Sequence, residues 1–363
     1  MDNTFYAFWL SHAWKLSTRK LWDCVRYTGG LKELYEADVR ELTGLTKREQ
    51  SILQQLKSQE EIIRAWESLE QQSYHFVSCE NPEYPNPLRK LPDMPFGIYY
   101  EGMLPKDEQP MVAIIGARQG SVYGKEFAYQ MAQELSGQGI GIVSGLAAGI
   151  DGAGHRGALD GNGYTAGVLG SGLHYVYPKE NYQLYCRMKQ RGGIISEYPP
   201  ETPPHSMLFP KRNRIISAMA DFVLVIEARE KSGSLITADL ALEQGTEVGA
   251  VPGRPCDNLY TGCNQLIQQG AKCILCAEDV LEELMDSGRL VKRGIKKELV
   301  NPDLGLAPKE KMVYSCVRLE PEFIDSIICR LTIPVWEGIQ ILTELERKGV
   351  IRQNPHQYYY RIR

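Results

Sequence analysis

Residues 111–124 read MVAIIGARQGSVYG, an apolar run that ends in a glycine-rich turn. The run from Val112 to Gly116 has no charged residue, which is typical of a strand buried under helices on both faces of a parallel sheet. Gly116 lets the backbone turn tightly and lets an anion approach the N-terminus of the next helix. Arg118 lies in this turn, and an arginine there suits a phosphodiester ligand better than a nicotinamide dinucleotide. The acidic residue that dinucleotide-binding motifs carry after the glycine-rich turn is also missing from its usual place. A purely structural strand–helix turn remains the alternative for this motif alone.

Further short apolar runs follow, and helical stretches lie between them. The predicted strands are Gly141–Gly145, Thr165–Gly170, Gly193–Glu197, Phe222–Glu227, Glu247–Val251 and Cys273–Cys276. Helices are expected at, for example, Tyr123–Ser136 and Leu235–Gln244. This alternation predicts an α/β fold with a doubly wound, mostly parallel, Rossmann-like sheet. Its ligand site should lie at the C-terminal ends of the strands.

Smaller parts flank this sheet on both sides. Residues 1–75 carry amphipathic helical patterns and predict a helical domain. The sheet domain is expected at residues 76–286, and the proline-rich stretch 81–95 near its start links it to the helical domain. A basic linker is expected at 287–307, and the order helix, turn, helix, hairpin in 308–363 is that of a winged helix. The expected helices are Tyr6–Trp14, Arg19–Tyr27, Leu31–Tyr35, Asp38–Leu42, Lys47–Glu70, Glu320–Arg330 and Val335–Lys348, and the hairpin strands are Val350–Gln353 and Tyr358–Ile362.

The composition narrows the class of protein. The chain has 363 residues, of which 43% are hydrophobic and 24% charged, as in a globular protein with a sizeable core. Because the formal net charge is −4, any contact with nucleic acid must come from a local basic patch. Apolar runs such as Phe222–Ile226 are too short to cross a bilayer, and Met1-Asp2-Asn3 lacks the basic start of a secretory signal. We expect a cytoplasmic protein with no membrane partner.

The nine cysteines are scattered, which fits a reducing compartment. Cys256, Cys263, Cys273 and Cys276 lie close in sequence, and the last two form a C-x-x-C pair that raises the question of zinc. Residues three apart on a strand point to opposite faces, so Cys273 and Cys276 are expected to be core residues rather than ligands. We predict no metal and no cofactor.

Cations and small residues recur at the predicted strand ends. Lys211, Arg212 and Arg214 open a helix as a phosphate clamp, and Ser232–Ser234 offers bare N–H groups at the start of another helix. No nucleophile–base pair stands out beside them, which favours binding over catalysis. The predicted phosphate-binding residues are Gly116, Arg118, Gly145, Gly149, Gly170, Gly172, Lys179, Lys211, Arg212, Asn213, Arg214, Ser232, Gly233 and Ser234.

Asp151 and His155 lie one helical turn apart and share a face of a helix. That spacing suits acid–base chemistry or metal ligation. The alternative is a capping aspartate with a histidine bonded to it, and we favour this alternative because no third ligand is evident.

Several motifs agree in sequence order with one family. They are Gly116-Ala117-Arg118 with Tyr123-Gly124, Ser144-Gly145 to Gly149-Ile150-Asp151 with His155, Phe209-Pro210 with Arg212-Asn213-Arg214-Ile215-Ile216, Ser232-Gly233-Ser234-Leu235-Ile236-Thr237-Ala238, Val251-Pro252-Gly253, and Asn264 with Leu266-Ile267 and Gly270-Ala271. Through these residues the chain resembles the DprA (also called Smf) family of DNA-processing proteins. The N-terminal part resembles that family's SAM-like or helix-hairpin-helix domain, and the tail resembles its winged helix.

The resemblance implies an extended Rossmann fold, a homodimer formed through that domain, and single-stranded DNA bound in a basic pocket. It also implies the RecA recombinase as a partner, with protection of incoming DNA and loading of RecA in natural transformation. Arg118 matches the family's DNA-binding arginine, and Lys179 or Lys211 matches its functional lysine. The segment Leu16-Ser17-Thr18-Arg19 lacks the glycine of a DNA-binding helix-hairpin-helix, so the N-terminal domain is not expected to bind duplex DNA.

Two other functions are compatible with parts of the sequence. The Rossmann variant also resembles the phosphoribohydrolases that cleave nucleoside monophosphates, but their Pro-Gly-Gly-x-Gly-Thr loop is replaced here by Lys231–Thr237. A transcription regulator is a weaker alternative, because the expected recognition helix carries Glu337, Glu344 and Glu346, which disfavour duplex phosphates. That helix suits a protein contact better.

Overall fold

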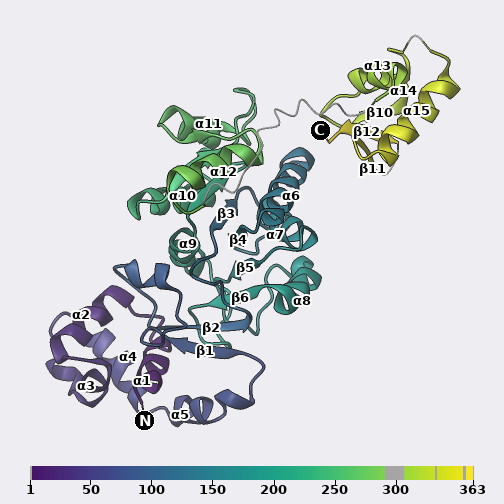
Figure 1. Cartoon of the computed structure of the whole chain (residues 1–363). Helices are drawn as coiled ribbons and strands as arrows, with labels where there is room; N and C mark the ends of the chain where they lie inside the picture. The colour runs from purple at the N-terminus through teal and green to yellow at the C-terminus, as the bar shows by residue number, and fades with distance from the viewer. Residues whose placement is uncertain (1, 291–305, 332, 355–356, 363) are drawn as a thin grey trace. The chain divides into compact units, whose positions relative to one another are not determined.

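The computed structural model describes residues 2–290, 306–331, 333–354 and 357–362 of the chain. The chain divides into two compact units, Met1–Val291 and Lys292–Arg363 (Figure 1). The first unit holds the N-terminal helices and a nine-stranded sheet, and the second holds a three-stranded sheet with its own helices. No helix in the described part of the chain is both long and apolar enough to cross a membrane.

The large sheet has the order β1-β2-β6-β5-β4-β3-β7-β8-β9. Its strands are β1 (His75–Ser78), β2 (Gly97–Gly102), β3 (Met111–Ile115), β4 (Gly141–Ser144), β5 (Thr165–Val168), β6 (Gly193–Ser196), β7 (Phe222–Val225), β8 (Glu247–Ala250) and β9 (Lys272–Cys273). All neighbours from β6 to β9 are parallel, while β1 pairs with β2 and β2 with β6 in antiparallel fashion. The predicted mostly parallel sheet is therefore confirmed.

Two details of the sheet differ from the sequence prediction. Strands β1 and β2 flank the proline-rich stretch and were not predicted. The predicted strand Cys273–Cys276 is wrong beyond its first residue, because the chain leaves the sheet after Cys273. Cys276 instead precedes α12, where its backbone N–H donates to the Asp279 carboxylate.

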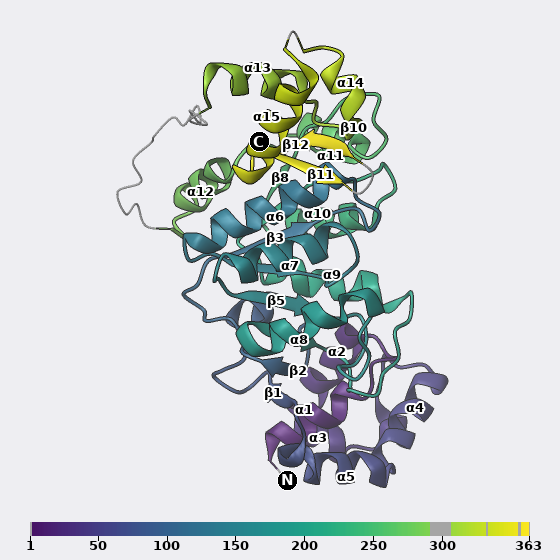
Figure 2. The ribbon, with the colours of Figure 1, turned by 90° about the vertical axis from the view of Figure 1, so that its right-hand side faces the viewer.

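Helices cover both faces of the sheet, as expected for a doubly wound fold. They are α6 (Val122–Gly137), α7 (Ile150–Asp160), α8 (Tyr182–Arg191), α9 (Leu208–Ala218), α10 (Gly233–Glu243), α11 (Thr261–Gln268) and α12 (Ala277–Asp286). On β3, Val112 and Ile114 belong to the core with α6, α7 and α12, whereas Ala113 and Ile115 belong to the core with α9, α10 and α11. Burial on both faces explains why these strands are continuously apolar. Figure 2 shows α6, α7 and α8 following one another along one face.

The N-terminal helices pack on β1 and β2, at the opposite end of the sheet from β9. They are α1 (Asn3–Ser11), α2 (Thr18–Thr28), α3 (Leu31–Glu36), α4 (Lys47–Lys57) and α5 (Glu60–Glu67), and the 3₁₀ turns of this unit are η1 (Val39–Glu41), η2 (Leu69–Gln71), η3 (Asn86–Lys90) and η4 (Lys179–Asn181). Phe8 of α1 packs its ring 5.2 Å from Phe76 and 5.9 Å from Tyr99. The single helix predicted for Lys47–Glu70 is wrong, because the chain ends one helix at Lys57 and begins another at Glu60.

The C-terminal unit contains α13 (Pro308–Cys316), β10 (Glu322–Phe323), α14 (Ile324–Ile328), α15 (Val335–Arg347), β11 (Ile351–Asn354) and β12 (Tyr358–Arg361). Helix α15 and the hairpin of β11 and β12 agree with the prediction. Helix α13 was not predicted, and the helix predicted for Glu320–Arg330 is instead a short strand and a shorter helix. The winged-helix class remains a prediction. The hairpin turn at Pro355 and His356 and most of the basic linker lie outside the described residues.

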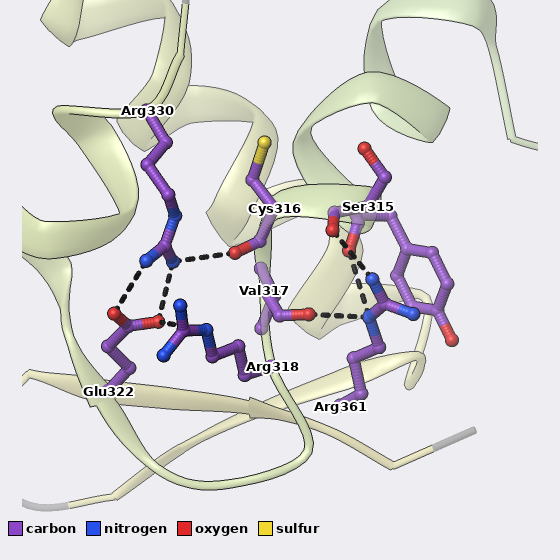
Figure 3. A network of polar contacts seen from close by, with 8 residues as sticks. Ser315, Cys316, Val317, Arg318, Glu322, Arg330 and Arg361 are labelled. Atoms are coloured by element: carbon purple, nitrogen blue, oxygen red, sulfur yellow. Dashed lines mark hydrogen bonds and ion pairs between the residues drawn. The ribbon is translucent and has the colours of Figure 1, made fainter.

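Ion pairs, and hydrogen bonds from arginine side chains to backbone carbonyls, connect these C-terminal elements (Figure 3). Glu322 of β10 accepts from Arg330 at 2.5 and 2.7 Å, and Arg330 also donates to the Cys316 carbonyl at 2.7 Å. Arg361 of β12 donates to the carbonyls of Tyr314 at 3.0 Å and Val317 at 2.5 Å. The end of α13 has carbonyls with no helical partner, and the two guanidinium groups satisfy several of them.

The close contact between α6 and α7 depends on Gly157. A Cβ at this position of α7 would lie 2.0 Å from the Tyr129 carbonyl oxygen of α6. We expect Gly157→Ala to lower the free energy of unfolding by about 1–3 kcal/mol, because the helices must separate to admit a methyl group. Gly137→Ala is the control, since its Cβ meets nothing within 4 Å at the end of α6. Urea denaturation measures both variants, and equal stabilities would contradict the contact.

Candidate nucleic-acid interface

A cavity of about 560 Å³ opens where β3 ends, between the starts of α9 and α10. The chain runs from β3 outward through β4, β5 and β6, and then returns to place β7 on the other side of β3. The cavity therefore lies beside the point where the strand order reverses, the usual ligand site of open α/β sheets. Of the predicted residues, those that line it are Gly116, Arg118, Arg212, Asn213, Ser232, Gly233 and Ser234.

Arg212 forms the floor of this cavity and is only 5% exposed. Its guanidinium donates to the Gly145 carbonyl at 2.7 Å and to the Val168 carbonyl, so it braces the ends of β4 and β5. Burial lowers the pKa of Arg212 to about 10, while nearby Asp151 raises it. The residue therefore stays charged at neutral pH and holds a fixed positive charge beneath the cavity.

Asp151 and His155 of α7 have separate partners. Asp151 accepts from the Gly145 N–H at 3.1 Å, and burial raises the pKa of its carboxyl group. The His155 ring bonds to the Thr165 hydroxyl at 2.7 Å, and burial lowers the pKa of this histidine to about 3. The aspartate thus has the structural role that we favoured, but the expected bond from His155 to Asp151 is wrong, because the imidazole points to β5.

Aromatic and cationic side chains meet at the rim. The exposed Arg118 guanidinium lies 5.1 Å from the centre of the Phe209 ring and has no carboxylate partner among the described residues. The Tyr177 ring is 46% exposed, and its centroid lies 5.7 Å from that of Phe209. Phe209 and Tyr177 were not among the predicted site residues. The one feature of the sequence that could have indicated them is that each lies two residues before a predicted cation, Lys211 or Lys179.

The N-terminus of α10 forms another wall. The Ser232 hydroxyl accepts from the Ser234 N–H at 3.4 Å and bonds to the Ser234 hydroxyl at 2.7 Å. Asn213 of α9 donates to the Gly233 carbonyl at 3.3 Å, which holds this turn against α9. A Cβ at Gly233 would meet nothing within 4 Å, so a ligand has open access to the start of the helix. Such a terminus favours an anion.

The other four predicted glycines do not line this cavity but allow close packing beside it. A Cβ at Gly145 would lie 2.5 Å from the Arg212 guanidinium, and one at Gly170 would lie 2.6 Å from the Phe209 ring. Gly172 packs against the carbonyls of the loop that follows β6, and Gly149 has a φ of +79° beside the turn after β3. These positions shape the site without offering it a donor.

Three predicted cations also lie outside the cavity lining. Lys179 is exposed at the start of η4, and Lys211 is exposed on the first turn of α9. Arg214 is buried and pairs with Glu197 at 2.6 Å and Asp93 at 2.9 Å. Because both carboxylates lie within hydrogen-bond distance, the positive charge of Arg214 is not available to a ligand.

The carboxylates in and beside the cavity are buried. Asp151 is the one carboxylate among the described residues that line the cavity, and it is buried against backbone N–H groups. Glu227 is fully buried and accepts from the Ser121 N–H at 2.8 Å and the Ser121 hydroxyl at 2.5 Å. No set of three metal-ligating side chains occurs among the described residues. The prediction that Cys273 is a core residue is wrong, because Cys273 is exposed on the edge strand β9, and Cys276 is partly buried.

The fold and the cavity define a Rossmann-like protein with a candidate ligand site at the strand-order reversal. Residues 75–285 match the family of the DNA recombination-mediator protein A, and the chain belongs to this family. It is 43% identical over 217 residues to the DNA processing protein DprA of Bacillus subtilis, covering 59% of this chain and 72% of that protein. It is 35% identical over 328 residues to Protein Smf of Escherichia coli, covering 89% of this chain and 87% of that protein.

Solved structures of two relatives have the same fold. DNA processing protein A from Streptococcus pneumoniae is 32% identical, with a TM-score of 0.67 over 78% of this chain and 98% of that one. DNA processing protein A from Helicobacter pylori is 30% identical, with a TM-score of 0.52 over 58% of this chain and 96% of that one. The structure of that relative concerns its single-stranded DNA binding mode.

The buried His155 makes stability depend on pH. Its pKa is about 3 in the folded chain and 6.5 for an ordinary solvent-exposed histidine, so between these values the unfolded chain binds the extra proton. Stability contributed by the neutral imidazole is therefore complete above pH 6.5 and is lost as the pH falls toward 3. At pH 5 we expect a loss of about 2 kcal/mol, and His155→Asn should remove this part of the pH dependence.

Thermal unfolding of the wild type and His155→Asn between pH 5 and 8 measures this difference. His75→Asn serves as the control, because His75 is exposed on β1. Parallel pH profiles for the wild type and His155→Asn would contradict the buried neutral imidazole.

Proposed function

We propose that this chain binds single-stranded DNA at the cavity beside β3, without catalysing a reaction on it. The main support for this proposal is that the cavity brings together Arg118, Arg212 and the start of α10. A single carboxylate, that of the buried Asp151, lies on its lining. Arginines and a helix N-terminus favour phosphate oxygens. Membership of the family, and the single-stranded DNA named for the Helicobacter pylori relative, support this ligand.

The geometry favours a single strand over a duplex. Phosphates fit the side formed by Arg118 and Gly233, while Tyr177 and Phe209 offer ring faces on which bases stack. A duplex hides the faces of its bases, so it gains only the phosphate contacts. Affinity for oligothymidine should be much higher than for duplex, with little sequence preference and a steep decrease with salt. Equal affinity for duplex, or cleavage of nucleoside monophosphates, would contradict the proposal.

Arg118 is the best single test of the site. Arg118→Ala removes one charge-assisted phosphate contact, and we expect a loss of about 1.5–3 kcal/mol in binding. This loss is a decrease of roughly tenfold or more in affinity for oligothymidine, measured by fluorescence anisotropy. Thermal stability should not change, because Arg118 is exposed and outside the core.

Arg26→Ala is the matched control, since Arg26 is an exposed arginine on α2 that pairs with Asp23. It should keep full affinity for oligothymidine. If Arg118→Ala binds normally but melts at a lower temperature, Arg118 has a structural role and Lys179 or Lys211 must supply the phosphate contact.

We further propose that the protein acts in the cytoplasm, protects incoming DNA in natural transformation and loads the RecA recombinase. Family membership supports this role. In a solution of RecA and single-stranded DNA covered by a single-strand-binding protein, the chain should shorten the delay before ATP hydrolysis. An unchanged delay would contradict loading.

We also propose a homodimer formed through the Rossmann-like unit at the β9 edge of the sheet. This strand has two residues, no strand of the described residues pairs with its outer edge, and the neighbouring Leu275 is 66% exposed. An edge strand with an exposed apolar side chain favours association with a second copy. The domain boundaries at residues 75, 286 and 307 stay predictions.

Leu275→Asp should weaken this association, because it puts a charge into an apolar contact. We expect the apparent mass in light scattering at micromolar concentration to fall toward that of one chain. Met103→Asp, at an exposed position beyond β2, should leave the mass unchanged. A wild type that is monomeric under these conditions would exclude the dimer.

A further inference from the structure

Two more hollows lie between the N-terminal helices and the sheet. One has a volume of about 740 Å³ and is bordered by α1, α4 and α5, and the other has about 210 Å³ and is bordered by the start of α2. Trp14 and Lys15 line both hollows, so the two lie side by side. We call them together the lateral groove.

The lateral groove also reaches the central cavity. Pro203 lines the larger hollow, and the next residue, Pro204, lines the central cavity. On α9, Lys211 lines the smaller hollow and Arg212 lines the central cavity. Successive Cα atoms are about 3.8 Å apart, so the groove and the central cavity border each other at these two segments.

Cations without an ion pair follow this path. Lys15, Arg48 and Lys211 are exposed, and none has a carboxylate partner among the described residues. The Lys15 ammonium lies 5.3 Å from the centre of the Trp14 ring. A ring beside a cation is the combination on which single strands bind, with a base on the ring and a phosphate on the cation.

The acidic residues of the groove are mostly occupied. Asp93 and Glu197 both bond to Arg214, and Glu201 lies 3.3 Å from His174. Glu61 is exposed on α5 and is the one lining carboxylate of the described groove without such a contact. The exposed cations Lys15 and Lys211 lie on the side of the groove toward Trp14 and α9, away from Glu61 on α5.

The smaller hollow offers further donors. Ser17 and Thr18 line it at the N-terminus of α2, where the cap makes no side-chain hydrogen bond and the first turn has no acidic residue. These groups suit an anion at this point of the path.

We propose that the N-terminal helical layer carries a second subsite for single-stranded DNA, formed by Trp14, Lys15 and Arg48. The subsite binds the part of a longer strand that leaves the central cavity across Lys211. This inference rests on the proposed function, because the strand enters the groove from that cavity. It gives the helical layer a role in binding single strands, which its lack of a helix-hairpin-helix glycine does not exclude.

The test compares oligothymidines of about 5 and about 20 nucleotides on the full chain. Lys15→Ala/Arg48→Ala should bind the short strand like the wild type and the long strand roughly tenfold or more weakly. Removal of two phosphate contacts should also reduce the salt slope for the long strand by about 1.4. Lys32→Ala/Arg64→Ala removes the same charge from α3 and α5 outside the groove, and should bind both strands normally.

Cross-linking gives an independent readout. Light-activated 5-iodouridine near one end of the long strand should attach to the peptide that contains Trp14. The inference is overturned if the double variant binds the long strand normally, if it loses affinity for both lengths equally, or if no cross-link reaches Trp14. Failure of the proposed function looks different, because the wild type would then not bind the short strand.

Discussion

The site depends on one buried guanidinium. Arg212 enters the sheet from α9 and donates to the carbonyls that end β4 and β5, which the parallel ladder leaves unpaired at this edge. Burial of a charge is costly unless it is bonded, and here the carbonyls and nearby Asp151 compensate it. The start of α9 is thereby fixed against the strand ends, and it carries Phe209 and Asn213 into place around the cavity.

This arrangement constrains the neighbouring residues. Gly145 must lack a side chain, because a Cβ would lie 2.5 Å from the guanidinium. Asp151 must stay close to Arg212, and its bond to the Gly145 N–H holds the loop after β4 against the start of α7. The glycines of this family motif therefore have two physical roles: Gly233 leaves open space for a ligand, while Gly145 and Gly170 let side chains of α9 approach the backbone.

The division of charge along α9 explains how an acidic chain can hold an anion. Three of four consecutive residues are cations, but their environments differ. Lys211 faces solvent, Arg212 braces the strands, and Arg214 forms ion pairs with Glu197 and Asp93. With a net charge of −4, the molecule relies on this local arrangement rather than on its overall field.

Much of the fold followed from local pattern. Continuous apolar runs and the alternation with helices predicted the parallel strands, because burial on both faces leaves no room for polar residues. The antiparallel β1 and β2 were missed, since the prolines between them obscure two short strands that pair only with each other and β6. The predicted strand through Cys276 failed because an apolar run alone does not distinguish a strand from a loop that packs before a helix.

By itself the sequence determined the doubly wound class, the strand ends at which a ligand site forms, and the family, because periodicity and ordered motifs are local properties of the chain. Only the tertiary structure decided which cations are available. Arg118 is exposed beside Phe209, whereas Arg214 is bound to two carboxylates that lie 17 or more residues away in sequence. The sequence cannot distinguish these arginines, since the charge that each one presents depends on which distant groups the fold brings within hydrogen-bond distance.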